Sequence, residues 1–146
     1  MEEASVPVSL KIVAALMLSL SVFIILINGY LVWLFTGHLF VSFTSIGIIA
    51  VVLLASGIVE FISGIGLINL KKWAWTWALY SMLVALVMFV ALIVNLSVIG
   101  GVIGGLPAAG ALAAVGTVVL IGPILIHVFA VVFLFTGEIR SLFPKD

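Results

Sequence analysis

The sequence predicts an all-α integral membrane protein, a four-helix bundle in which residues 1–146 form a single transmembrane domain. Two observations support this fold class. The 146 residues are 66% hydrophobic and only 7% charged, with a mean hydropathy of +1.60, whereas a soluble domain carries roughly 25% charged residues. Four apolar segments are also long enough to cross a hydrocarbon core of about 30 Å, which takes ~20 helical residues.

The four predicted spans are joined by short connections. We expect them at about residues 10–35, 43–70, 73–99 and 111–136. Backbone groups in lipid must bond internally, so each span is expected to be a helix. The connections read TGHLFVS at 36–42, NLKKW at 69–73 and GGVIGGLPAAG at 100–110. The second allows only a tight helical hairpin, and the third is rich in glycine, which favours a break between helices.

The basic residues predict the orientation. With four spans, all of them fall on one side of the membrane: Lys11, Lys71, Lys72, Arg140 and Lys145. Lysine and arginine concentrate on the cytoplasmic side of membrane proteins. We therefore expect the N- and C-termini to be cytoplasmic.

Aromatic residues follow the lysine pair directly, in the stretch KKWAWTWALY. Lysine and tryptophan are typical of the membrane–water interface. A cluster of tryptophans can also form a cage for a ligand, but its place beside the lysines favours an interfacial belt. We expect these membrane-interface anchors: Lys71, Lys72, Trp73, Trp75, Trp77 and Arg140.

An ionisable residue lies deep in the second span. Glu60 precedes Lys71 by 11 residues, about 16 Å of helix, which is close to the midplane. In the fourth span His127 precedes Glu138 by the same 11 residues. Both spans run toward the basic side, so the two side chains are predicted to lie at the same depth and to meet if their helices are neighbours.

Small and polar residues surround these positions. Ser56, Gly57, Ser63 and Gly64 form a small-residue stripe on the Glu60 face of the second span, which allows another helix to approach closely. We interpret Asn28, Ser56, Ser63 and Asn95 as the intramembrane polar support of the pair. Pro123, four residues before His127, predicts a kink in the fourth span.

Three interpretations of Glu60 stay open at this point. It can be structural, holding helices together through hydrogen bonds. It can belong to a proton or ion path with His127, the default hypothesis for a carboxyl group inside a membrane. It can also face another subunit and make a polar contact there.

Several function classes find no support in the sequence. The net charge is zero, which predicts no binding to nucleic acid. There is no cysteine. Glu60 and His127 alone are too few ligands for a metal site. No nucleophile has a visible base beside it. We therefore expect neither enzymatic activity nor a cofactor nor a metal.

Two stretches carry a resemblance to known proteins. GIGLINLKKWAWTWAL (64–79) and FLFTGEIRSLF (133–143) resemble parts of small, uncharacterised four-span membrane proteins of archaea and bacteria. Those proteins have a basic-Trp-x-Trp hairpin and a short charged tail. The resemblance implies four spans in a prokaryotic cell membrane, but it implies no activity.

With almost no chain outside the bilayer, such a protein must act through its helix surfaces. The sequence favours a structural or accessory subunit of a larger membrane complex, or a homo-oligomer. Its expected partners are membrane lipids and other membrane subunits or copies of itself. The alternative is a small transporter or proton-coupled channel that uses Glu60 and His127.

Overall fold

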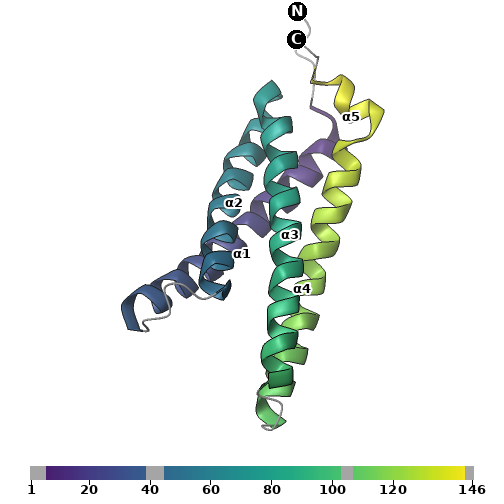
Figure 1. Ribbon diagram of the computed structural model, residues 1–146. Coiled ribbons are helices and arrows are strands. Elements are labelled where there is room, and N and C mark those ends of the chain that lie inside the picture. The colour runs from purple at the N-terminus through teal and green to yellow at the C-terminus, as the bar shows by residue number, and fades with distance from the viewer. Residues whose placement is uncertain (1–5, 39–44, 103–106, 144–146) are drawn as a thin grey trace, which may run out of the picture.

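A computed structural model describes residues 6–38, 45–102 and 107–143. Within these ranges the protein has no strand and four helices long and apolar enough to cross a membrane, so the predicted all-α four-span bundle is confirmed. The elements are α1 (Val8–His38), α2 (Ser45–Ile68), α3 (Lys72–Val102), α4 (Pro107–Leu134) and a short α5 (Gly137–Ser141), shown in Figure 1.

Several helix ends differ from the prediction. α1 continues through Thr36 to His38, and α3 and α4 take up residues 100–102 and 107–110 of the expected glycine-rich connection. Outside a helix, the backbone N–H and C=O groups of a glycine would need water as a hydrogen-bond partner, and lipid offers none. Glycine therefore breaks helices less readily in a membrane. Pro107 takes the first position of α4, where its missing N–H costs nothing. The short α5 was not expected.

The helices pack in chain order. α1 contacts α2, α2 contacts α3 and α3 contacts α4, whereas α1 and α4 touch at few points. In Figure 1, α1 begins beside α4 and α5 near the chain termini and runs obliquely away from α4. The bundle is therefore closed at one end and more open at the other.

The closed end, called the basic end here, carries Lys11, Lys71, Lys72 and Arg140, all exposed. Its core draws buried side chains from all five helices. They are Leu10, Val13, Ala14, Met17, Leu67, Ala74, Ala78, Leu79, Met82, Ala130, Leu134, Ile139 and Phe143. The opposite half has a smaller core of Ile24, Ile49, Leu53, Ala85 and Phe89.

Glycines in α2 allow its close approach to both neighbours. A Cβ on Gly66 would lie 2.5 Å from the Ala74 Cβ of α3. A Cβ on Gly57 would lie 2.9 Å from Ile24 Cγ2 of α1, and one on Gly64 would lie 3.0 Å from Leu18 Cδ2 of α1. The predicted small-residue stripe therefore receives α1, as small residues do between membrane helices.

The hairpin between α2 and α3 is as tight as the sequence predicts. The N–H of Lys71 donates to Gly66 O at 2.9 Å, and the N–H of Leu70 donates to Leu67 O at 3.0 Å. This is the Schellman arrangement that ends many helices, usually with glycine in the left-handed position. Here Leu70 holds that position, with φ at 49°, and its side chain packs against the basic-end core.

Candidate functional site

Glu60 of α2 and His127 of α4 meet inside the bundle. Glu60 Oε1 lies 3.0 Å from His127 Nε2, and each side chain is 1% exposed. α2 and α4 make little direct contact, so the two side chains bridge a diagonal of the bundle. Along both helices the pair lies between the basic-end core and the smaller core of the opposite half.

The second ring nitrogen fixes the proton arrangement. His127 Nδ1 lies 2.8 Å from the carbonyl oxygen of Pro123. A carbonyl oxygen only accepts, so Nδ1 must carry a hydrogen. Nε2 then either accepts from a protonated Glu60 or donates to an ionised one. In both arrangements one proton lies between Oε1 and Nε2, and the pair has no net charge.

The apolar surroundings favour a Glu60–His127 pair without net charge. An unpaired charge in an apolar interior is very costly. The Phe89 ring packs edge-on against the imidazole, with ring centroids 5.5 Å apart. Phe89 and Pro123 also line an apolar cavity on the side of the pair away from the basic end. Phe89 and the apolar cavity therefore cover the pair on the side away from the basic end.

The predicted supporting residues bond locally. The side-chain amides of Asn28 and Asn95 donate to the carbonyls of Ile24 and Ala91, each four residues earlier. Ser56 Oγ donates to Val52 O at 2.9 Å. Ser63 Oγ is buried, and the residues that the structure describes offer it no hydrogen-bond partner. None of these contacts extends the pair into a polar chain.

The predicted interface anchors divide into two groups. Trp73 and Trp77 are about half exposed beside the exposed Lys71 and Lys72. Trp75 is different, because its indole turns inward. Its Nε1 donates to Leu134 O at 3.0 Å, and its ring meets Phe135 edge-on.

This contact was not predicted from the sequence, although one signal for it was present. Trp73, Trp77 and Tyr80 share a helix face by their spacing, and Trp75 is out of phase with that face. Leu134 is the last residue of α4, where helix carbonyls lack an internal partner. Trp75 supplies that partner and ties the end of α4 to α3.

Metal chemistry gains no candidate from the structure. Across residues 6–38, 45–102 and 107–143, no three histidine, aspartate or glutamate side chains gather as metal ligands do. Lys145 and the end of the predicted charged tail lie outside the described residues.

No family model, no curated protein and no solved structure matches the chain. The resemblance to small four-span prokaryotic proteins therefore stays a hypothesis, and the inferences below rest on the geometry of this chain.

Proposed function

We propose that this multi-pass membrane protein is a structural or accessory subunit of a larger membrane assembly, or a homo-oligomer, without enzymatic activity of its own. Four apolar helices make it a membrane protein. The proposal adds that it lies in a prokaryotic plasma membrane with both termini cytoplasmic, following the basic residues at one end of the bundle.

The main support is that the most polar group of the bundle is satisfied within the chain. Glu60 bonds to His127 of the same molecule, and both are buried between apolar cores. A carboxyl group held this way links α2 to α4, and this Glu60–His127 contact is called the cross-brace here. The carboxyl group is then not available to a neighbouring subunit. Partner subunits would therefore contact the side chains on the outer faces of the helices.

α4 is the least buried of the four spans. In its most apolar stretch only 17% of residues are buried, against 33–39% in the other three spans. Its outward side chains follow a spacing of three and four, and each is more than half exposed: Val115, Val118, Leu125, Phe129 and Val132. Gly122 lies in the middle of this face with nothing within 4 Å of an added Cβ. Small residues at such positions let a second helix approach closely.

The test is gentle extraction of the protein from its own membrane, followed by native mass spectrometry. We expect the wild-type chain to emerge in a fixed ratio with other subunits or with copies of itself. Gly122→Leu should emerge alone, because its Cβ meets no atom of this chain within 4 Å while the added side chain blocks close approach by another helix. Ala55→Leu, at an exposed small residue of α2, is the matched control and should keep the partners.

A wild-type chain that emerges as a monomer would contradict the proposal. Loss of partners in both leucine variants would also count against it, because the α4 face would then have no special role.

The direct contact of Glu60 with His127 favours a second candidate, a small proton-coupled transporter or channel. A shared proton between a buried carboxyl group and an imidazole is a common element of proton relays. Glu60→Gln keeps a hydrogen-bonding side chain but cannot exchange a proton. Proton flux into vesicles that falls to background in Glu60→Gln would support this candidate, whereas equal flux in both proteins would exclude it.

A further inference from the structure

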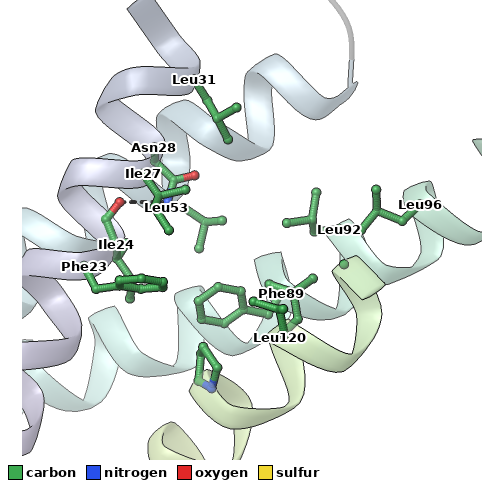
Figure 2. A pocket seen from close by; sticks show the side chains of 13 residues that line it. Phe23, Ile24, Ile27, Asn28, Leu31, Leu53, Phe89, Leu92, Leu96 and Leu120 are labelled. Atoms are coloured by element: carbon green, nitrogen blue, oxygen red, sulfur yellow. Dashed lines mark hydrogen bonds between the residues drawn. The ribbon is translucent and has the colours of Figure 1, made fainter. Parts of the chain in front are cut away.

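A cavity of about 210 Å³ lies in the half of the bundle away from the basic end. It separates α1 from α3 and α4, and Figure 2 shows Leu53 and Phe89 facing into it from opposite sides. Phe23 and Ile27 of α1 and Val119 of α4 line it and are each about half exposed. Its mouth therefore opens between α1 and α4 toward lipid.

One polar side chain lines this cavity. Asn28 is 5% exposed, and its amide nitrogen donates to Ile24 O at 2.9 Å. Its carbonyl oxygen Oδ1 faces into the cavity in Figure 2. The remaining lining residues are phenylalanine, isoleucine, leucine, valine, glycine and proline, whose side chains have no hydrogen to donate. Asn28 Oδ1 is therefore an acceptor at the cavity wall that no lining side chain can satisfy.

Size and polarity limit what can occupy this space. A dry apolar cavity of about 150 Å³ in a protein core is large enough to bind benzene. A lone water would find too few partners here, because an ordered water makes about three hydrogen bonds. An ordinary acyl chain would fill the volume but leave Oδ1 without a donor, which is unfavourable.

We propose that this cavity binds one membrane-soluble molecule with a hydroxyl group on an apolar chain or ring, and that the hydroxyl donates to Asn28 Oδ1. The apolar part lies against α1, α3 and α4 and extends through the mouth into the bilayer. This ligand is a small molecule, so the proposal goes beyond the role in a membrane assembly proposed above.

Photolabelling of the full chain in liposomes tests this site. The probe is a long-chain alcohol with a photoreactive diazirine beside the hydroxyl, and the matched control probe is its methyl ether, which cannot donate. We expect saturable labelling of lining residues such as Ile24 and Leu53, about three- to tenfold stronger for the alcohol, as one net hydrogen bond implies. The lipid-facing Val87 and Val90 of α3 report unspecific labelling.

Two variants sharpen the test. Asn28→Leu keeps the size of the side chain and should remove the preference for the alcohol over the ether. Leu92→Trp places a larger side chain in the cavity and should abolish saturable labelling of both probes. Equal labelling by alcohol and ether in the wild type would overturn the hydroxyl ligand in favour of an ordinary acyl chain. Labelling of the lining no stronger than that of Val87 and Val90 would overturn the site itself.

Discussion

The two halves of the bundle are built differently. At the basic end, alanine and glycine let the helices approach closely, and all five helices contribute to one core. In the opposite half a smaller core of mostly bulky side chains comes from α1, α2 and α3, and a cavity separates α1 from α4. The two halves thus differ in how α1 meets α4, because one shared core closes the basic end and a cavity lies between these helices in the opposite half.

This difference shows how α4 is held. Two side-chain hydrogen bonds between described residues of different helices involve α4: Glu60 with His127, and Trp75 with Leu134 O. Lipid is as apolar as a leucine side chain, so apolar contact alone drives helix association weakly in a membrane. Polar contacts therefore position the least buried helix, one at mid-depth and one at the basic end.

The largest effect is expected from breaking the mid-depth contact. His127→Leu leaves the Glu60 carboxyl group buried without a partner, which should lower the free energy of unfolding by about 3 kcal/mol. The double variant Glu60→Leu with His127→Leu should recover most of this loss, because no polar group then stays unpaired. Unfolding of the protein in mixed detergent micelles measures both.

A control for this series is Val128→Leu, at an exposed position of the same helix, which should change stability by less than about 0.5 kcal/mol. If the double variant is as unstable as His127→Leu alone, the two side chains are not coupled and the cross-brace interpretation is wrong.

The second largest effect is expected in the unfolding free energy when a glycine of each half is replaced by alanine. Gly66→Ala places a methyl group 2.5 Å from the Ala74 Cβ, and neither group can rotate away. We expect a loss of about 1–3 kcal/mol in unfolding free energy, as in other overpacked cores. Gly122→Ala, with nothing within 4 Å, should stay within about 0.5 kcal/mol of wild type. Equal stability of the two variants would show that the basic end is no more tightly packed than the open half.

The smallest effect concerns the end of α4. Trp75→Phe removes the hydrogen bond to Leu134 O and should cost about 0.5–1.5 kcal/mol. Hydrogen exchange of the amides in residues 135–141 should speed up, because that segment loses its hydrogen bond to α3. Trp77→Phe, at a lipid-facing position of the same helix, should leave these exchange rates unchanged. Similar exchange in both variants would argue against a role of Trp75 as a cap.

Much of this architecture follows from the sequence alone. Length and hydropathy determine the number of spans, and helix geometry makes the shared depth of Glu60 and His127 a matter of counting residues. The helix faces are harder to predict, because lipid-facing and buried positions are equally apolar. This is why the inward turn of Trp75 was missed. The cavity depends on the angle between α1 and α4, which no local pattern encodes.

The glutamate–histidine bond also has an electrical consequence. Moving one charge across a whole membrane involves about 2.3 kcal/mol for each 100 mV. Transfer of the shared proton from Oε1 to Nε2 covers at most the 3.0 Å between these atoms, about a tenth of the ~30 Å hydrocarbon thickness. Even if the bond lay along the membrane normal, 100 mV would shift the transfer by only about 0.2 kcal/mol. The contact between Glu60 and His127 is therefore nearly insensitive to voltage.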